Sequence, residues 1–558
     1  MTLRIAVIAD QGQVQKFAIH ALDQICGCEE ITVFSCENTR IRRRMLKHGA
    51  YYGLNLLSVR NPLSRSVPVA SGRKRVTDSV SFDSLYDGAW QILPEEIVDR
   101  LANSGFDVVL KFGMSLMRVP SAERLSVPIL SYHHGDPDHY RGRPAGFYEI
   151  LDKAPAVGQI VQLLSNVLDG GAVVAFAETK VHRHSYRATL VEAYRHSPLI
   201  INEAIANAIA GKTIPKSSRG RNYRLPSNWL VARFLFRMAM AFMARLFYGA
   251  FLEKSWSVST APLDPAALAT GGMPPRRQWT TLQRPPGYAF IADPFFNPSG
   301  AGVLVEALDR RSATGEILLI EGSNWRDLTR SGRHHSFPGT AEEHGETYIV
   351  PEVAQWSSPR IYRMGDEGLT EVAALTVEGN PRITDPVLFR HRGHLYLFGN
   401  NTEQGSGVLS LWTGTSLFDQ FRLHPRSPIR ISPLGSRMAG ALMHDAGVLW
   451  RFGQDFTGAY GDGIFVFQVK EISSHSYSED LHRKIRFEEV KGPHTLNVRS
   501  GLAVFDWYVD TLSPLAWTRR LRQKTGPSPP RQTGVRFSEK GGRAPALLFV
   551  RRSRPRQR

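Results

Sequence analysis

Two adjacent histidines lie in the stretch SYHHGDPDHYRGRP, residues 131–144, together with two acids and two arginines. Imidazoles this close to carboxylates can perform general acid/base catalysis, bind a metal ion, or only form a hydrophilic turn. Downstream, Asp169 stands in the turn LDGG between two apolar runs. Such an acid is usually a turn former, but beside His133 it would raise the proton affinity of the imidazole and fix its orientation. The two residues together favour an acid/base pair.

Alternating strand-like and helical patterns surround this stretch. Apolar runs such as RIAVIA, EITVFS, FDVVLKF, VPILSYH and AVVAFA are separated by amphipathic segments such as PEEIVDRLANSG. This alternation predicts an α/β domain over residues 1–215, with a Rossmann-like, mostly parallel sheet covered by helices. Ligands bind beyond the carboxyl ends of the strands in such sheets, and the histidine stretch directly follows the run VPIL. We therefore expect it to line a ligand site.

Two motifs in this region resemble the formyltransferase family, which includes methionyl-tRNA, glycinamide-ribonucleotide and sugar-nucleotide N-formyltransferases. They are H-x-x-x-x-x-x-Y-R-G from His133 to Gly142 and G-x-x-x-Q-x-L-x-x-x-L-D-x-G from Gly158 to Gly171. The resemblance covers about residues 1–210. It implies that a formyl group moves from N10-formyltetrahydrofolate to a primary amine without a metal, with His133 and Asp169 as catalytic residues.

The same resemblance assigns roles to the neighbouring positions. Ser131 stands where the family has an asparagine, and its shorter hydroxyl would donate one hydrogen bond to an oxyanion. Phe112, Gly113 and Met114 correspond to the loop that shapes the pterin pocket, where a glycine permits close backbone approach. We expect these three residues to bind the cofactor.

The polar residues that flank His133 are expected to contact the substrate. His134 is interpreted as a substrate contact rather than a metal ligand. Arg141 and Arg143 either carry solvated charges or bind a substrate phosphate through bidentate hydrogen bonds. The expected substrate is an amino sugar or a nucleotide-linked sugar.

Residues 216–255 contain the apolar run NWLVARFLFRMAMAFMARLFYGAF. It is long enough to span a bilayer, but each arginine at the membrane centre would cost about 2.5–3.5 kcal/mol. We therefore expect an amphipathic linker helix. The apolar face of this helix, residues 229–252, either packs on neighbouring elements or lies on a membrane surface. The range denotes the whole helical run that carries the face.

Residues 256–515 have a different pattern, with many short β-rich runs between Gly, Pro and Asn. Examples are YAFIADPFFN, GVLVEAL, HLYLFGN, VLSLWTG and GIFVFQV. The sequence Ala-Asp-Pro-Phe at 292–295 recurs as Thr-Asp-Pro-Val at 384–387. A repeated unit of roughly fifty residues per sheet is typical of propeller blades, and five blades fit the length. We predict an all-β five-bladed propeller.

This region resembles the N-terminal domain of plant glucosamine inositolphosphorylceramide transferases, itself similar to five-bladed propellers of glycosidase family 43. The resemblance rests on ADPFFNPSGAGVLVEAL, HHSFPGTAEEHGETYIVPEV, TDPVLF, RMAG, RFGQDF and HTLN. It implies a central site, whose expected residues are Asp293, Glu352, Asp385, His335, Arg437, Gln454, Asp455 and His494. An acid before proline also caps turns, so Asp293 and Asp385 have a purely structural alternative. Hydrolase, transferase and carbohydrate-binding module all remain open.

Composition and charge exclude several classes of protein. The composition, 42% hydrophobic and 22% charged residues, is that of a globular protein. A chain of 558 residues is too long for a single hydrophobic core, so we expect several domains. Most of the net charge of +18 lies in a Pro/Gly/Arg-rich tail, 516–558, which we expect to be disordered. We therefore expect no specific nucleic-acid partner. Peripheral membrane contact through the tail is the alternative.

The three cysteines lack zinc-site spacing, and MTLRIAVIAD has the pattern of a first strand rather than a signal peptide. We expect a reduced, cytoplasmic setting, with contact at the inner membrane face as the alternative. Two classes of function follow. One is an N-formyltransferase whose propeller binds or processes a glycan. The other is a scaffold in which the formyltransferase fold is degenerate and the propeller is the glycan-binding, glycosidase or glycosyltransferase-associated module.

Overall fold

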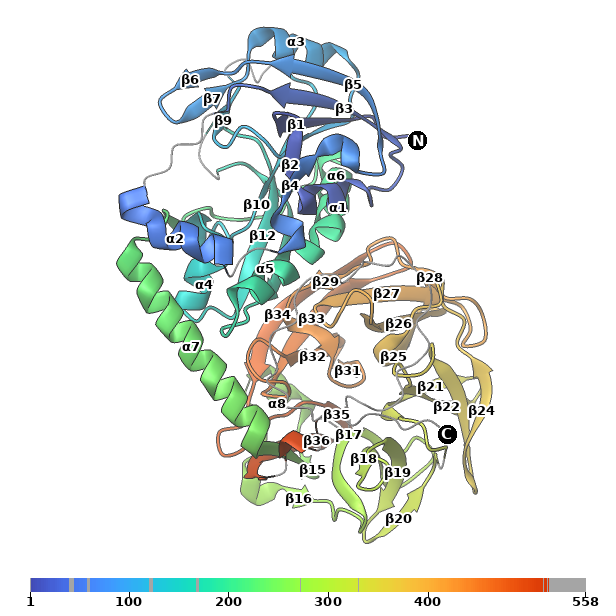
Figure 1. Cartoon of the computed structure of the whole chain (residues 1–558). Coiled ribbons are helices and arrows are strands. Elements are labelled where there is room, and N and C mark those ends of the chain that lie inside the picture. The colour runs from blue at the N-terminus through green and yellow to red at the C-terminus, as the bar shows by residue number, and fades with distance from the viewer. Residues whose placement is uncertain are drawn as a thin grey trace, which may run out of the picture.

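The computed structural model describes residues 2–39, 45–57, 61–119, 124–166, 170–270, 272–329, 331–514, 516–518 and 520. The chain forms an α/β unit followed by an all-β unit, and one long helix runs along both (Figure 1). The catalytic role predicted for Asp169 falls outside the described residues, and so does most of the tail 516–558 that was predicted to be disordered. Residues 516–518 are described and helical, and Ala516 is buried, so disorder is wrong for the start of that tail.

The α/β unit is built on a nine-stranded sheet. Its strands are β1 (Ile5–Asp10), β2 (Gln13–Gln15), β3 (Glu30–Cys36), β4 (Ser66–Pro68), β5 (Arg75–Phe82), β8 (Val108–Lys111), β10 (Ile129–His133), β12 (Ala156–Leu163) and β13 (Val173–Lys180). Strands β5, β3, β1, β8 and β10 are parallel in this order, whereas β12 and β13 continue the sheet antiparallel. The sheet is therefore mixed rather than mostly parallel, because an apolar run does not encode its direction.

Helices cover both faces of this sheet. They are α1 (Lys16–Leu22), α2 (Met45–Leu57), α3 (Glu95–Asn103), α4 (Phe147–Leu151), α5 (Tyr186–Arg195) and α6 (Ser197–Ile209). Alternate residues of β1 point to opposite faces: Ile5 and Val7 pack with α1 and α6, whereas Ala6 and Ile8 pack with α3. A small sheet joins β6 (Leu85–Asp87), β7 (Trp90–Ile92) and β9 (Met117–Arg118).

The predicted linker, residues 216–255, is part of the folded structure. Strand β14 (Arg221–Tyr223) pairs with β11 (Tyr140–Gly142), directly after the histidines. Helix α7 (Asn228–Phe251) follows and is capped by the Ser227 hydroxyl, which accepts a hydrogen bond from the Leu230 amide. Strand β15 (Leu252–Pro262) begins at the next residue. Among the described helices, none combines the length and the apolar character that a membrane span requires.

The all-β unit contains five consecutive antiparallel sheets around a common centre (Figure 1). The first four are β17 (Tyr288–Phe296), β18 (Val303–Asp309), β19 (Gly315–Glu321), β20 (Asn324–Asp327); β21 (Ser336–Glu343), β22 (Glu346–Glu352), β23 (Arg360–Gly365), β24 (Gly368–Ala374); β25 (Ile383–His391), β26 (His394–Asn401), β27 (Val408–Gly414), β28 (Arg422–Leu423), β29 (Arg430–Ile431); and β30 (Leu434–Met438), β31 (Met443–Asp445), β32 (Val448–Asp455), β33 (Ile464–Ile472), β34 (Tyr477–Ile485). The fifth sheet joins β15 and β16 (Thr280–Thr281) to β35 (Leu496–Arg499) and β36 (Leu502–Leu512).

The first strand of each of the first four sheets has the same irregularity. The pairing register shifts between 292 and 295, 336 and 339, 384 and 387, and 434 and 437. The residue at each bulge has a positive φ: 47° at Asp293, 45° at Phe337, 47° at Asp385 and 82° at Gly435. The repeat seen in two segments of the sequence thus extends to four, although two members lack the aspartate.

Polar and apolar contacts hold the two units together. The Ser432 hydroxyl donates to Glu178 Oε2 at 2.6 Å, and His196 Nε2 lies 3.1 Å from the Gln404 carbonyl. Val408 and Ile431 of the β unit are buried in the hydrophobic core of the α/β unit. The units therefore share one continuous packed interface.

Candidate functional site

His133 is the last residue of β10, so its side chain lies at the carboxyl edge of the parallel strands. A Cβ added to Gly135 would lie 2.8 Å from His133 Nε2 and 2.5 Å from the Tyr140 carbonyl oxygen. Only a glycine therefore lets the loop fold back beneath the imidazole. The neighbouring turn after β8 and the end of β1 lie at the same edge, as the strand register requires.

The two acids of the loop anchor it. Asp136 accepts a hydrogen bond from Lys216 Nζ at 3.1 Å. Asp138 accepts from the Ser217 amide and hydroxyl, both at 2.7 Å, and from the Ser218 amide. Burial opposes ionisation of Asp138, but these hydrogen bonds and Lys216 lower its pKa. The acids therefore fix the backbone around His133.

His134 is enclosed by aromatic rings. Its ring centroid lies 5.1 Å from that of Phe17, 4.7 Å from Tyr132 and 4.9 Å from Tyr194. Burial, with a smaller contribution from His133, lowers the pKa of His134 to about 3, so the ring is neutral. Its Nε2 is buried and has no hydrogen-bond partner within the described ranges. Its expected contact with a substrate remains a prediction.

The turn expected to bind the cofactor packs inward. The amides of Phe112 and Gly113 donate to the Ile8 carbonyl, and the Met114 amide donates to Asp10 Oδ1 at 2.8 Å. A Cβ on Gly113 would lie 2.6 Å from the carbonyl carbon of Ala9. The close approach expected at Gly113 is therefore made to β1. The Met114 side chain is fully buried in the core, and its expected contact with a cofactor stays a prediction.

Arg141 and Arg143 lie on the strand that pairs with β14 and just beyond it. Arg141 Nη1 donates to the Ser218 carbonyl at 3.2 Å, so this guanidinium ties the loop to the segment before α7. Both arginines line a crevice of about 10 Å³, far below the size of a ligand site. Their proposed grip on a phosphate remains a prediction.

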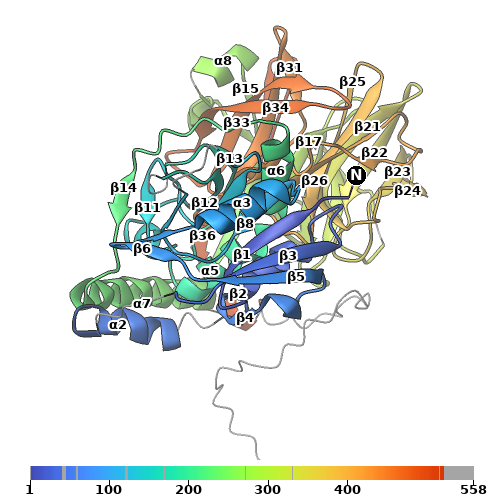
Figure 2. The same cartoon turned by 90° about the horizontal axis from the view of Figure 1, so that it is seen from above.

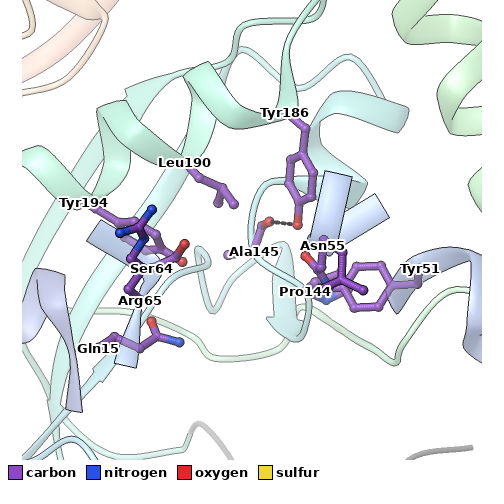
Figure 3. Close-up of a pocket in the computed structure, with 11 residues that line it drawn as sticks. Gln15, Tyr51, Asn55, Ser64, Arg65, Pro144, Ala145, Tyr186, Leu190 and Tyr194 are labelled. Atoms are coloured by element: carbon purple, nitrogen blue, oxygen red, sulfur yellow. Dashed lines mark hydrogen bonds between the residues drawn. The ribbon is translucent and has the colours of Figure 1, made fainter. Parts of the chain in front are cut away.

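A cavity of about 550 Å³ lies beside the loop (Figure 3). Its walls are Gln15, Tyr51, Asn55, Leu56, Ser64, Arg65, Pro144, Ala145, Tyr186, Leu190 and Tyr194. Of these eleven residues Arg65 alone is charged. The Tyr186 hydroxyl donates to the Ala145 carbonyl at 2.9 Å, and burial raises the pKa of Tyr51, Tyr186 and Tyr194. Neutral hydroxyls and one cation suit a polar ligand with an anionic group.

Sequence reasoning missed this cavity. Its lining comes from β2, α2, the segment after Pro62–Ser64, the Pro144 turn and α5, which share no motif. The cavity is nevertheless close to the histidine stretch, because Pro144 belongs to it and the Tyr194 ring packs on His134. The stretch and the cavity thus form one candidate site.

The centre of the β unit holds a buried ionic network. His494 Nδ1 lies 3.1 Å from Asp293 Oδ1 and 3.2 Å from Asp506 Oδ2, and the Thr495 hydroxyl donates to Asp293. Burial alone would lower the pKa of His494, but the two carboxylates raise it to about 10. These three residues are close enough to hold a metal ion. In this structure the positive charge beside Asp293 and Asp506 is that of the protonated His494 ring.

A second group pairs Asp385 with Arg437. Arg437 donates to both carboxylate oxygens, at 2.5 and 3.1 Å, and Gln454 Nε2 donates to Asp385 Oδ2 at 2.8 Å. Glu352 accepts from the Asp385 amide at 3.0 Å. Burial and the neighbouring Asp385 raise the pKa of Glu352 well above its usual value. The network thus links the second, third and fourth sheets.

Two of the residues expected at the centre lie elsewhere. His335 is bound by the Arg333 carbonyl and the Tyr362 hydroxyl, so it supports the second sheet. Asp455 accepts from Thr457 and pairs with Lys484, so it caps a turn of the fourth sheet. Local sequence did not distinguish them from their neighbours, because adjacent residues of a strand face opposite sides.

Sequence reasoning also missed members of the network. They are Glu306, Tyr460, Thr495 and Asp506. Burial, with Asp293 and Glu352 nearby, raises the pKa of Glu306 well above its usual value. The Tyr460 ring packs on His494 at 4.5 Å and beneath the Arg437 guanidinium at 5.3 Å. Glu306 and Asp506 lie within buried strands, whereas Tyr460 and Thr495 lie in the connections between strands, so no single pattern in the sequence marks all four.

Residues 284–517 match the family model described as "Glucosamine inositolphosphorylceramide transferase 1, N-terminal". Glucosamine inositolphosphorylceramide transferase 1 of Oryza sativa subsp. japonica is 26% identical over 242 residues, covering 41% of this chain and 31% of that protein. The Arabidopsis thaliana protein is 25% identical over 241 residues, covering 40% and 30%. The chain thus spans less than a third of the length of these relatives. Its β unit is similar to their family.

Solved structures similar to parts of the chain fall into two groups. Glycinamide ribonucleotide transformylase 1 from Symbiobacterium toebii is 20% identical, with a TM-score of 0.27, covering 40% of this chain and 94% of that one. A sugar N-formyltransferase from Shewanella is 12% identical, with a TM-score of 0.26, covering 40% and 76%. RS223-Beta-xylosidase is 11% identical, with a TM-score of 0.28, covering 36% and 79%. At these TM-scores the similarities determine neither fold nor activity.

Proposed function

We propose that the α/β unit transfers a formyl group from N10-formyltetrahydrofolate to the primary amine of an amino sugar or nucleotide-linked sugar. The observation that carries this proposal is the position of His133 at the carboxyl edge of β10, in a loop whose Pro144 lines a cavity of about 550 Å³. A cavity of this size accepts a sugar nucleotide or a pterin. Arg65 would pair with an anionic group of the ligand, and the tyrosines would bind hydroxyls.

The residues present fit a folate cofactor at this edge. His134 Nε2 is buried without a partner among the described residues, and the His134 ring packs on Tyr194, which lines the cavity. Phe112 is only partly buried and would offer its ring. When bound, the cofactor supplies an activated formyl group at N10. His133 would hold the proton released by the attacking amine or donate to the developing oxyanion, with Asp169 as its orienting partner.

Formyl transfer by the full chain tests this proposal. Tetrahydrofolate release and product mass would be followed with nucleotide-linked amino sugars as acceptors. We expect His133→Ala to lower the rate by about 10²–10⁴. His139→Ala is the matched control, because this histidine lies in the same loop with 70% of its side chain exposed. Absence of turnover with every acceptor, or an unchanged rate in His133→Ala, would reject formyl transfer.

For the β unit we propose a five-bladed propeller that binds a glycan rather than cleaving it. Five consecutive sheets, the bulge repeated in four of them and the pairing of β15 with β36 support the propeller. A glycosidase needs two carboxyl groups at least about 5 Å apart, one of them protonated. Here Glu306, whose pKa is raised well above its usual value by burial and by Asp293, interacts directly with Asp293, and Arg437 binds Asp385 through both oxygens. A glycan array with the full chain would test binding, and release of sugar from a bound glycan would contradict it.

A further inference from the structure

Helix α7 presents an apolar stripe to solvent. The stripe consists of Trp229, Phe236, Met240, Met243, Phe247 and Phe251, each between 43 and 78% exposed. At 3.6 residues per turn, these side chains fall within about 80° of one another around the helix axis. The helix is about 36 Å long, and the stripe runs along most of it. Its apolar surface is therefore continuous, unlike the scattered single apolar residues that are normal on a protein surface.

The opposite side of α7 is fixed to the protein. Val231 and Phe234 are buried, and the Phe234 ring stacks on Phe147 with centroids 4.2 Å apart. At the other end, the Tyr248 hydroxyl donates to Asp510 Oδ1 at 2.6 Å. The helix therefore cannot turn to bury its stripe without breaking these contacts.

Helix α2 extends the apolar surface at the N-terminal end of α7. The Asn228 side chain accepts from the Ala50 amide and donates to the Leu46 carbonyl, which joins the two helices. Leu46 is 98% exposed and Leu56 is 72% exposed. Figures 1 and 2 both show α2 beside α7 at one edge of the molecule.

Charge identifies the partner. The 24 residues of α7 include Arg233, Arg237 and Arg245 but neither aspartate nor glutamate, and α2 also lacks acids. A second copy of the chain would set these arginines against each other without a compensating carboxylate. An exposed apolar stripe on a helix that carries arginines and no acids instead matches the interface of an anionic bilayer.

We propose that α7, with the exposed residues of α2, docks the protein on an anionic membrane surface. The apolar stripe lies at the boundary between headgroups and acyl chains, and the helix lies in the membrane plane. The proposal does not depend on formyl transfer. It places Leu56, which also lines the cavity of about 550 Å³, near the lipid.

Vesicle co-sedimentation of the full chain tests this docking. The probes are phosphatidylcholine vesicles with and without phosphatidylglycerol, at low and high salt. We expect binding only to the anionic vesicles, and about tenfold or more weaker binding for the double variant Phe236→Ser, Met243→Ser. Phe418→Ser is the matched control, because this exposed phenylalanine lies on the β unit away from α7 and should leave binding unchanged.

Three results would overturn the proposal. The first is no binding of the parent chain to anionic vesicles. The second is unchanged binding in the double variant, which would assign the contact to the basic tail. The third is a dimer in solution that the double variant dissociates, measured by light scattering. Both substituted side chains are exposed, so thermal unfolding should match the parent; Phe247→Ser provides a second variant if it does not.

Discussion

The histidine loop of the α/β unit and the centre of the β unit are both rich in polar residues, yet they differ in how those residues are used. At the centre of the β unit, the ionisable groups bind one another and are almost completely buried. In the histidine loop, Asp136 and Asp138 bind the backbone and Lys216, and Pro144 of the same loop lines a cavity. A cluster of acids and bases is thus a better sign of stability when its members satisfy one another. It is a better sign of chemistry when the loop that carries it lines a cavity.

The largest change in the free energy of unfolding is expected when the ion pair between Arg437 and Asp385 at the centre of the β unit is broken. Arg437→Met leaves Asp385 buried without its cation, which typically costs about 3–5 kcal/mol in the free energy of unfolding. Urea denaturation followed by fluorescence would measure this. Exposed Arg363→Met, on β23, should change the free energy by less than about 0.5 kcal/mol. Equal effects of the two substitutions would mean that the network is not what stabilises the β unit.

A pH series sharpens the comparison further. His494 has a pKa of about 10 in the folded protein against an ordinary value of 6.5. The folded state therefore keeps a proton that the unfolded chain loses, and this stabilisation is complete below pH 6.5 and lost as the pH rises toward 10. The raised pKa values of Glu306 and Glu352 act in the same direction above pH 4.5.

Urea midpoints between pH 6 and 10 should therefore fall by the equivalent of a few kcal/mol. His494→Gln should flatten this slope even if it lowers stability overall. His444→Gln, at an exposed position of the same unit, should leave the slope unchanged. A slope that persists in His494→Gln would assign the pH dependence to the two glutamates alone.

In the β unit a buried ion pair is expected to stabilise the fold. In the α/β unit we expect a close backbone contact at Gly113 to have this role. Gly113→Ala places a Cβ within 2.6–2.7 Å of the β1 backbone, and such overpacking costs about 1–3 kcal/mol. Thermal unfolding would measure the loss. Gly53→Ala is the control, because nothing lies within 4 Å of its Cβ and alanine favours the α2 helix. Unchanged thermal unfolding of Gly113→Ala would mean that the turn can shift away from β1 at little cost in free energy.

The smallest effect is expected at His134. Phe fits the same aromatic surroundings, so His134→Phe should change the free energy of unfolding at pH 7 by less than about 1 kcal/mol. Because the pKa of His134 is lowered to about 3, its contribution falls as the pH drops from 6.5 toward 3, and the variant should lose this acid sensitivity. A loss of formyl transfer at unchanged stability would instead identify His134 as a substrate contact.

Sequence predicted the elements better than the site. Apolar runs located β1, β8 and β10 correctly, because a buried strand needs such a run whatever its neighbours. The direction of β12 and the inward packing of Met114 depend on tertiary contacts and were missed. His133 was placed at a strand end by a motif, whereas Arg65 and Tyr194 meet only after folding. The repeat at Asp293 and Asp385 was visible because proline marks it, but its glycine version at Gly435 was not.

The pairing of β15 with β36 has a consequence for synthesis. Eleven residue pairs join these strands, yet about 240 residues separate them, so at about 5–20 residues per second β15 waits roughly 10–50 s for its partner on the ribosome. During that time its edge is open to wrong pairing, and α7 leads directly into it. The α/β unit is complete by then and already carries the helix. The synthesis of β36 therefore decides when the edge of β15 is protected from aggregation.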